Sequence, residues 1–351
     1  VPEVITLTPG ALAAFRAVGL AGEVTAVMRP LASFDLRRGP RRARLAGPGE
    51  MGLVPARALG EVLRQAAACA GAQVREGVHV SDPLLDGAIV RGATLTDGTR
   101  RIRLPAAVTI AADGRGSMLA RSLGLLHHPR VVRRLAVVAR FAGVVDPPAG
   151  RDLHLLRSGW AAVTSLADGD VLVHAVGPRG HEGEPPLHAV RRLVASDPYL
   201  AARLGAAEVV GGPWAVGLVE AMAPRPGGPG VLLAGDAAGC VETLGDQGLH
   251  VAVRGGALAA HVARAVLGRP ELAGHLELAR RRHAAFGAEL RRARALRLLA
   301  GWPAGPRALV TLAGHVPAVG RAALSGFAAR PSGCTVADRP AQPRQGRQEL
   351  S

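Results

Sequence analysis

The sequence predicts a mixed α/β fold with a three-layer α/β domain and a second domain built on an antiparallel sheet. One observation is the apolar run Val231–Ala234, which ends at a Gly-Asp pair and is followed by small apolar residues at helical spacing. Another is a set of strand-like runs at 135–145, 160–166 and 171–176, separated by Pro- and Gly-rich turns. A strand, glycine turn and helix in succession are typical of open α/β sheets, whereas strands without intervening helices indicate an antiparallel sheet.

The composition describes a globular chain of 351 residues, 48% hydrophobic and only 3% aromatic, with a core of Ala, Val and Leu. All 43 residues counted as Lys or Arg are Arg, and Asn is also absent, so the net charge of +16 reflects a bias spread along the chain. Because no arginine cluster interleaves with aromatic residues, we expect no nucleic-acid partner.

Cys69, Cys240 and Cys334 are far apart and odd in number. They have no metal-ligand spacing, so we expect no metal site and a reduced, cytoplasmic setting. No run of about 20 apolar residues predicts a transmembrane helix. The apolar segment 306–329 either covers the core or makes a weak contact with a membrane surface.

Local signals place most of the other elements. Thr8 and Pro9 begin a helix that ends at Gly19, and alternating residues around an arginine-rich loop at 24–48 predict a hairpin. Residues 72–80 alternate as a strand, and Asp97-Gly98 joins two further strands. A helix at 188–204 is interrupted at Asp197-Pro198, and 271–299 forms one long arginine-rich helix.

The stretch from Gly235 to Ala260 carries the clearest candidate site. Its first turn places the carboxylate of Asp236 at the carboxyl end of a strand, where open α/β sheets bind their ligands. Residues 245–250, Gly-Asp-Gln-Gly-Leu-His, bring backbone N–H groups to the start of a helix, where negative charge is favoured.

This stretch resembles the ribityl-binding motif of the flavoprotein hydroxylase superfamily, G-D-A-A-H…P…G-G-Q-G-M-N, and the G-D-A-A-G form of its geranylgeranyl reductase and halogenase branches. The resemblance implies that Asp236 binds the ribityl chain of FAD and that the helix start faces the flavin pyrimidine edge. The cofactor-binding residues implied by the motif are Gly235, Asp236, Gly245, Gln247, Gly248, Leu249 and His250. The sequence departs from the hydroxylase motif at Thr243, Asp246 and His250.

Two further blocks resemble the same superfamily. Residues 54–80 are similar to two of its segments, a helix start with an Arg close to FAD and the pattern A-x-V-x-x-G-x-x-V. The resemblance makes Arg57 a candidate FAD contact and places Val80 where the backbone meets the adenine. An ordinary surface arginine is the alternative for Arg57. Residues 112–121 resemble the A-D-G-x-x-S-x-x-R segment that contacts FAD through Asp113 and Gly114.

The superfamily's first βαβ unit has no counterpart in this sequence, since no G-x-G-x-x-G precedes the helix at 8–19. We therefore expect an N-terminally truncated, Rossmann-like FAD/NAD(P)-binding domain. The FAD-binding domain is predicted at 1–30, 50–125 and 215–300. The substrate domain is predicted at 31–49 and 126–214, C-terminal helices at 301–329, and a disordered tail at 330–351.

The resemblance implies an FAD-dependent oxidoreductase with NAD(P)H as reductant and a small organic molecule as substrate. A monooxygenase is favoured, with a geranylgeranyl reductase-like alkene reductase and a non-catalytic truncated remnant as alternatives. The resemblance argues against halogenase activity, because the halogenases of the superfamily depend on a Lys and a W-x-W-x-I-P segment that this chain lacks. Trp214 either walls the substrate site or packs in the core; the sequence indicates no catalytic side chain and no oligomeric state.

Overall fold

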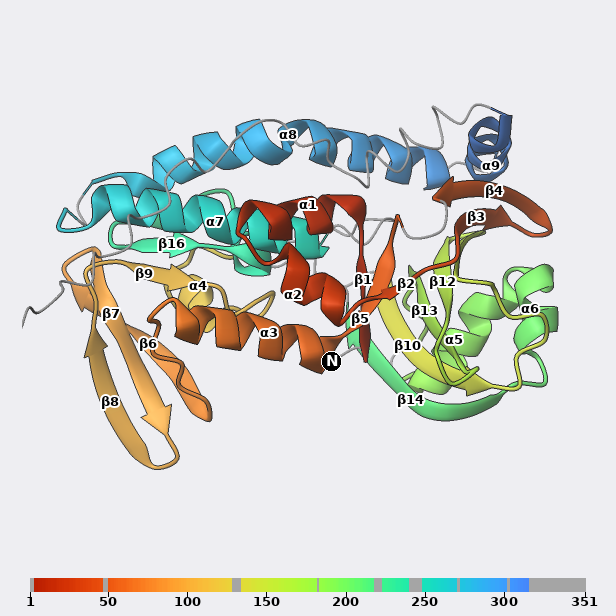
Figure 1. Cartoon of the computed structure of the whole chain (residues 1–351), viewed down its shortest axis with the longest axis horizontal. Coiled ribbons are helices and arrows are strands. Elements are labelled where there is room, and N and C mark those ends of the chain that lie inside the picture. The colour runs from red at the N-terminus through yellow and green to blue at the C-terminus, as the bar shows by residue number, and fades with distance from the viewer. Residues whose placement is uncertain are drawn as a thin grey trace, which may run out of the picture.

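The computed structural model describes residues 3–46, 50–127, 134–181, 183–217, 223–239, 248–269, 272–301 and 304–315. Helices and three small sheets form one half of the molecule, and a seven-stranded sheet with its own helices forms the other (Figure 1). The mixed α/β class predicted from the sequence is therefore confirmed.

The first small sheet has the order β1-β5-β2 and is antiparallel, and short helices surround it. The elements are β1 (Val4–Leu7), α1 (Pro9–Ala17), α2 (Ala21–Ala26), β2 (Arg29–Pro30), β5 (Gly52–Pro55) and α3 (Ala56–Cys69). Thr8 caps α1, because its side chain accepts a hydrogen bond from the backbone N–H of Ala11 at 3.2 Å. The predicted start of this helix is therefore confirmed, and Gly19 follows its end at a φ of +80°.

The second small sheet has the order β15-β16-β9, and its strands β16 and β9 are parallel neighbours. It consists of β9 (Thr109–Ala111), β15 (Gly227–Gly228) and β16 (Val231–Leu233). The turn η1 (Gly235–Ala238) follows β16, and two long helices follow the turn: α7 (Gly248–Val266) and α8 (Gly274–Gly301). Because β9 and β16 run in the same direction, the loops after both strands lie at one edge of this sheet.

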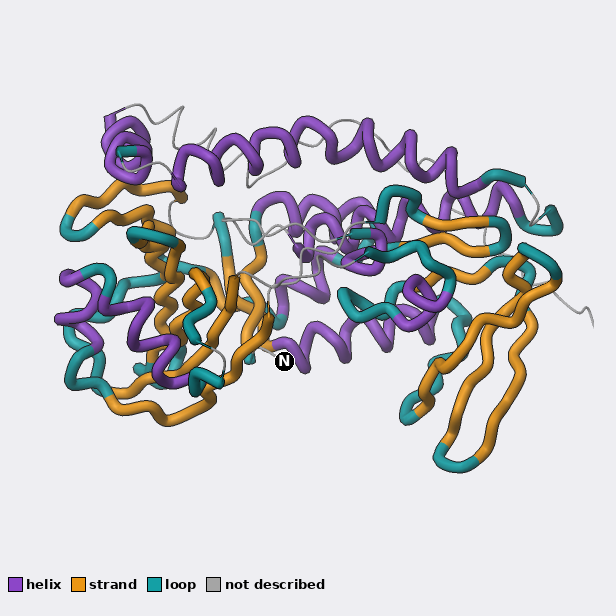
Figure 2. Tube along the Cα trace, turned by 180° about the vertical axis from the view of Figure 1, so that it is seen from behind, coloured by secondary structure: helices purple, strands orange, loops and turns teal. Residues whose placement is uncertain are grey.

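The third small sheet, β6-β7-β8, is antiparallel and extends away from the helices, as the view from behind shows (Figure 2). Its strands are β6 (Val78–Asp86), β7 (Ile89–Asp97) and β8 (Arg100–Pro105), and α4 (Met118–Ser122) packs against β6. The hairpin predicted at Asp97-Gly98 is confirmed. The strand predicted at 72–80 is wrong in its first part, because β6 begins only at Val78 and the preceding residues have no regular structure.

The seven-stranded sheet has the order β14-β10-β13-β12-β11-β3-β4 and is antiparallel except where β3 runs parallel to β11. Its strands are β3 (Phe34–Arg38), β4 (Arg41–Ala46), β10 (Arg134–Ala142), β11 (Arg151–Leu156), β12 (Gly159–Ser165), β13 (Val171–Pro178) and β14 (Glu208–Gly217). Of the hairpin predicted at 24–48, the part formed by β3 and β4 is confirmed and lies at the end of this sheet. The prediction is wrong for its first part, because 24–26 belong to α2 and β2 pairs with β5 in the first small sheet.

Each face of this sheet has its own hydrophobic core. One face packs under α5 (Pro186–Ala195) and α6 (Pro198–Leu204), and the other packs in part under α9 (Gly305–His315). The break predicted between the two helices at Asp197-Pro198 is confirmed, since Asp197 accepts a hydrogen bond from the N–H of Tyr199 at 3.0 Å and begins α6. We call the side covered by α5 and α6 the outer face and the opposite side the inner face.

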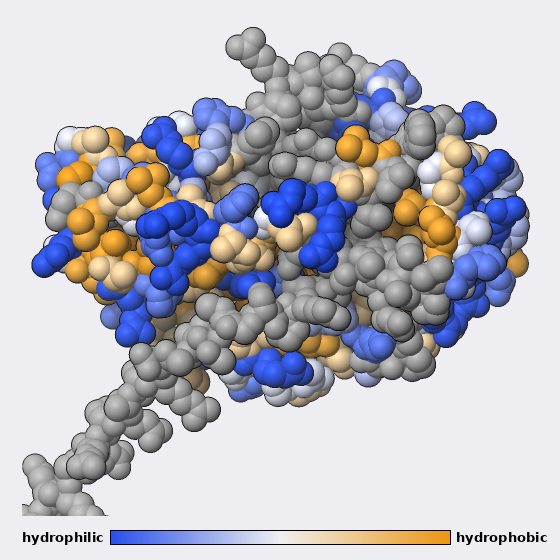
Figure 3. All heavy atoms as spheres, turned by 90° about the horizontal axis from the view of Figure 1, so that it is seen from above, coloured by the Kyte–Doolittle hydropathy of each residue, from blue (hydrophilic) through white to orange (hydrophobic). Residues whose placement is uncertain are grey.

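No helix of the described residues is long and apolar enough to span a membrane. Seen from above, the molecule shows hydrophobic and hydrophilic residues interleaved rather than separated (Figure 3). The predicted weak contact with a membrane surface stays a prediction, and the predicted disordered tail lies outside the described residues.

Candidate cofactor site

The Gly-Asp turn after β16 has the backbone conformation that its sequence requires. Gly235 has a φ of +57°, which favours glycine, and the turn closes with a hydrogen bond from the N–H of Gly239 to the carbonyl of Asp236 at 3.1 Å. The side chain of Asp236 remains 39% exposed. A carboxylate is therefore presented to solvent at the carboxyl end of a buried strand.

A second turn lies beside it, after β9. The carboxylate of Asp113 accepts a hydrogen bond from the N–H of Met118 at 2.8 Å, and Ser117 caps α4 through the N–H of Ala120 at 3.0 Å. Gly114 has a φ of +81°, which again favours glycine.

The structure brings these two turns together, as the sequence predicts for Asp113, Gly114, Gly235 and Asp236. Ala111 at the end of β9 is in register with Leu233 at the end of β16. Arg115 in the second turn places its Nε 3.8 Å from Oδ2 of Asp236. The arginine was not predicted as a site residue, because only the parallel pairing of the two strands brings it to Asp236.

The start of α7 provides the third side of the candidate site. Gly248 is exposed, and among the described residues nothing lies within 4 Å of a Cβ atom at this position, so these residues leave the first turn of the helix open to a ligand. In Figure 1 this end of α7 is turned toward the seven-stranded sheet. The other two predicted residues of this loop, Gly245 and Gln247, lie outside the described residues.

The next two residues of α7 face the protein. Leu249 packs in the hydrophobic cluster around α1, and His250 is buried with its Nδ1 2.9 Å from the carbonyl oxygen of Gly10. A carbonyl oxygen only accepts hydrogen bonds, so Nδ1 of His250 carries the proton. The side chain of His250 therefore holds α7 against α1, which leaves only its backbone for the predicted contact with the cofactor.

Arg57 and Val80 occupy different surroundings. Arg57 is an exposed residue of the first turn of α3, and Val80 on β6 packs against the cluster that contains Val90 and Leu119. The predicted roles of Arg57 and Val80 in FAD binding stay predictions.

Arg282 on α8 also reaches the candidate site, although it is not one of the residues that the sequence predicts there. Its Nη2 donates a hydrogen bond to the carbonyl oxygen of Ala238, in the Gly-Asp turn, at 3.3 Å. No signal in the sequence distinguishes this arginine from the others, since the contact joins residues 44 positions apart.

The inner face of the seven-stranded sheet carries an apolar and aromatic surface. The side chains of Val138, His174 and Trp214 lie side by side on it, because Val138 is the register partner of both other residues. Trp160 packs edge-on against His174, with ring centroids 4.9 Å apart. Trp214 is 42% exposed, so it is not a core residue, and we call these four side chains the aromatic surface.

The inner face is turned toward the helical half of the molecule. Arg140, on the same face of β10 as Val138, binds Glu3 just before β1 with an Nη1–Oε2 distance of 3.3 Å. It also binds Asp168 and Asp170 in the turn before β13 at 2.5 and 2.7 Å. The hydrogen bond that Arg140 donates to Asp170 raises the pKa of Arg140, so this cation stays charged and links the two halves.

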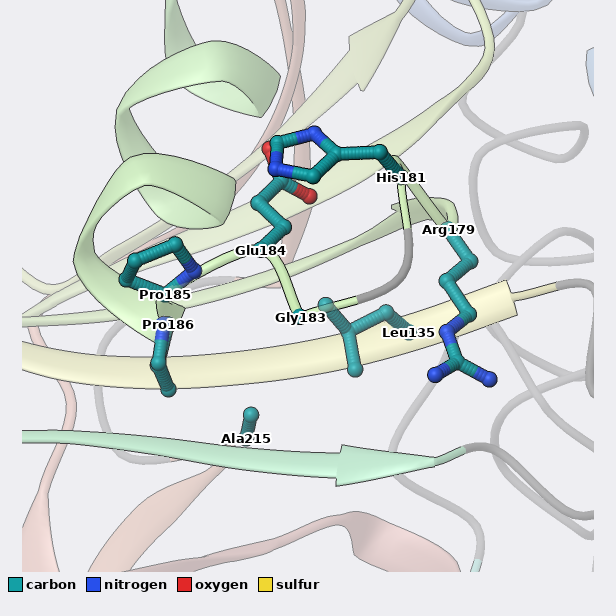
Figure 4. A pocket seen from close by; sticks show the side chains of 8 residues that line it. All are labelled: Leu135, Arg179, His181, Gly183, Glu184, Pro185, Pro186 and Ala215. Atoms are coloured by element: carbon teal, nitrogen blue, oxygen red, sulfur yellow. The ribbon is translucent and has the colours of Figure 1, made fainter.

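A cavity of about 380 Å³ lies between β10, β14 and the loop that leads to α5 (Figure 4). Leu135 and Ala215 form its floor, and Glu184 at its side is bound by Arg192 at 2.7 Å. Leu135 packs with the core under α5, so the cavity lies on the outer face of the sheet. It is therefore separate from the aromatic surface and from the Gly-Asp turn.

The comparison with known proteins agrees with this geometry. Residues 4–156 match the family model of the FAD binding domain. The chain is 31% identical over 230 residues to digeranylgeranylglycerophospholipid reductase 2 from Methanopyrus kandleri, covering 62% of this chain and 56% of the relative. It is equally identical over the same length to menaquinone reductase from Mycolicibacterium smegmatis, covering 61% and 54%.

A solved structure, a flavoprotein/dehydrogenase from Cytophaga hutchinsonii, has the same fold with a TM-score of 0.76 and 19% sequence identity, covering 93% of this chain and 84% of that one. The resemblance to the FAD-dependent oxidoreductases that the motifs predict is confirmed by these findings. The chain spans about half the length of the curated relatives that it matches.

Proposed function

We propose that this chain binds FAD at the Gly-Asp turn and acts in an FAD-dependent reductase whose substrate is an apolar, alkene-bearing lipid. The observation that carries the proposal is the arrangement of two glycine turns at neighbouring strand ends beside the open start of α7. The preference for a reductase comes from the two curated relatives, both of which are named as reductases of lipids.

The residues at this site fit FAD. The carboxylate of Asp236 is an acceptor for the hydroxyl groups of a ribityl chain. The first turn of α7 offers backbone N–H groups that lack partners within the helix, with the positive end of the helix dipole behind them. Gly235 and Gly248 keep Cβ atoms away from the ligand. When bound, FAD supplies the two-electron chemistry that no side chain here can supply.

The protein would then bind and orient both molecules. Asp236 holds the cofactor chain, and the start of α7 stabilises negative charge on the ring system. His250 fixes the position of α7 through the carbonyl of Gly10. On the other side, the aromatic surface offers Trp214 and Val138 to an apolar substrate and excludes water from it.

The proposed reaction adds one hydride and one proton across a carbon–carbon double bond. NAD(P)H is oxidised to NAD(P)⁺ and supplies the hydride, and solvent supplies the proton. Hydroxylation is the second candidate, because Gly245, Gln247 and Gly248 match the G-x-Q-G part of the flavoprotein hydroxylase motif. That reaction consumes one molecule of oxygen and one proton for each NAD(P)H, leaves one oxygen atom on the substrate and releases the other as water.

The two candidates differ in a single experiment. The purified chain is supplied with FAD, NADPH or NADH deuterated at C4, and either menaquinone or a geranylgeranyl lipid, with and without oxygen. A reductase forms its product under nitrogen as well. That product is heavier than the substrate by two hydrogen atoms, one of which is deuterium where the hydride of the deuterated cofactor is transferred. A hydroxylase gives a product heavier by one oxygen atom and only in air. If neither product forms with any of the lipids, the proposed activity is refuted.

The aromatic surface supplies a matched pair of variants. Trp214→Ala removes an exposed ring from this surface, whereas Val145→Ala removes an exposed side chain from the turn after β10. We expect Trp214→Ala to raise KM for the lipid about tenfold with a smaller effect on kcat, and Val145→Ala to change neither. Equal KM values for the two variants would show that the aromatic surface does not bind substrate.

A further inference from the structure

Arg282 lies where α8, α7 and the Gly-Asp turn meet. Its Nη2 binds the carbonyl of Ala238 at 3.3 Å, and its Cζ lies 5.6 Å from the centroid of the Phe286 ring. Its Nη1 is fully covered and approaches the backbone of α7 at Gly255. The guanidinium thus links its own helix α8 to α7 and to the turn that presents Asp236.

Within the described part of the chain, nothing compensates the positive charge of Arg282. Among the described residues no carboxylate pairs with Arg282, and its buried Nη1 has no hydrogen-bond partner. Burial lowers its pKa, but an arginine still keeps its charge at neutral pH. A buried cation without an anion is costly, so this side chain is not explained by the stability of the protein alone.

Gly255 makes the approach of Arg282 possible. A Cβ atom on Gly255 would lie 3.1 Å from Nη1 of Arg282 and 3.8 Å from the backbone nitrogen of Gly235. The adjacent Gly256 has nothing within 4 Å of its Cβ position. Of these two neighbouring glycines of α7, therefore, only Gly255 lies against the guanidinium of Arg282.

We infer that Arg282 is a positioning residue of the FAD site, which fixes the Gly-Asp turn through Ala238 and supplies positive charge that the anionic cofactor compensates. The inference rests on the proposed binding of FAD. A neutral donor would be sufficient to hold the carbonyl of Ala238. The uncompensated charge is explained when a ligand with phosphate groups and an electron-rich ring binds near this turn.

A positioning role and a purely structural role predict different results for Arg282→Met. Methionine keeps the apolar contacts with Phe286 and removes a buried charge, and such replacements are often neutral or stabilising for the unliganded protein. We expect the unfolding midpoint of the FAD-free variant to equal or exceed that of the wild type. We expect its affinity for FAD to fall at least tenfold and the reduction potential of bound flavin to become more negative.

The experiment is a titration of FAD by flavin fluorescence quenching, with the unfolding midpoint of each FAD-free protein measured in parallel. Arg282→Lys should recover part of the affinity because it restores the charge. Arg281→Met is the matched control, because Arg281 is the adjacent residue and only binds Glu277 on the surface of α8 at 2.7 Å. An Arg282→Met variant that binds FAD as tightly as Arg281→Met would overturn the inference.

The glycine pair tests the same inference without removing a charge. Gly255→Ala and Gly256→Ala both improve the helix propensity of α7 by about 1 kcal/mol. Only Gly255→Ala displaces Arg282, so we expect its dissociation constant for FAD to be at least threefold higher than that of Gly256→Ala. Equal dissociation constants for the two variants would overturn the inference that Arg282 positions the FAD site. Absence of FAD binding by the wild-type protein would instead refute the proposed function.

Discussion

The buried histidine of the outer face predicts how the stability of this protein depends on pH. His154 on β11 is completely buried, and among the described residues neither ring nitrogen has a hydrogen-bond partner. Its Nε2 lies 3.9 Å from the buried carboxylate of Asp152, which Arg37 and Arg203 bind at 2.5 and 3.4 Å. The ring of Tyr199 stacks on His154 with a centroid distance of 6.3 Å.

Burial, and then the positive charges of Arg203 and Arg37, lower the pKa of His154 from 6.5 to about 3. In the unfolded chain the histidine takes up a proton below its ordinary pKa, while the folded protein cannot until the pH nears its lowered value. The free energy of unfolding therefore falls as the pH is lowered through this window, by about 1.4 kcal/mol per pH unit. Between pH 6.5 and pH 5.0, His154 alone lowers the free energy of unfolding by about 2 kcal/mol.

The assay is urea unfolding at pH 7.5 and pH 5.0, followed by far-UV circular dichroism. His154→Leu should lose about 2 kcal/mol less than the wild type between these two conditions, whatever its stability at pH 7.5. His79→Gln is the control, because His79 is exposed on β6 and should leave the pH dependence unchanged. If His154→Leu loses as much stability as the wild type between pH 7.5 and pH 5.0, His154 is not the source of the pH dependence.

The remaining predictions concern stability and are measured by the same denaturation at neutral pH. Ser117→Ala removes the buried cap of α4 and should lower the free energy of unfolding by about 1–2 kcal/mol; an unchanged value would mean that Ala120 finds another acceptor. The buried carboxylate of Asp35 binds two arginines of β4 at 2.8 Å each, and Asp35→Asn should lower the free energy of unfolding by about 1–3 kcal/mol. Asp82→Asn removes one exposed pair and should cost less than about 1 kcal/mol, so equal effects at Asp35 and Asp82 would contradict the role of burial.

Elements with strong local signals could be predicted from the sequence. The cap at Thr8, the hairpin turn at Asp97-Gly98 and the helix start at Asp197 depend on side chains and glycine conformations within a few residues. The Gly-Asp turn was also recognisable, because a buried strand, a glycine at positive φ and a helix follow one another along the chain.

Contacts between distant segments could not be predicted in this way. β3 pairs in parallel with β11, more than a hundred residues later, and no local pattern specifies that partner. The side chain of His250 reaches Gly10 on another helix, and Arg282 reaches Ala238 across α7. The strand expected at 72–80 began late because alternation alone does not supply a pairing partner, which β7 provides only from Val78.

The proposed binding of FAD at the Gly-Asp turn is open to a single titration. FAD is added to the wild type, to Asp236→Asn and to Asp86→Asn, whose carboxylate is exposed on β6 far along the chain from the turn. We expect a yellow wild-type complex with quenched flavin fluorescence. We expect Asp236→Asn to bind FAD at least tenfold more weakly and Asp86→Asn to bind it with unchanged affinity. A wild-type protein that stays colourless, or an Asp236→Asn variant that binds as tightly as Asp86→Asn, would contradict the proposed binding.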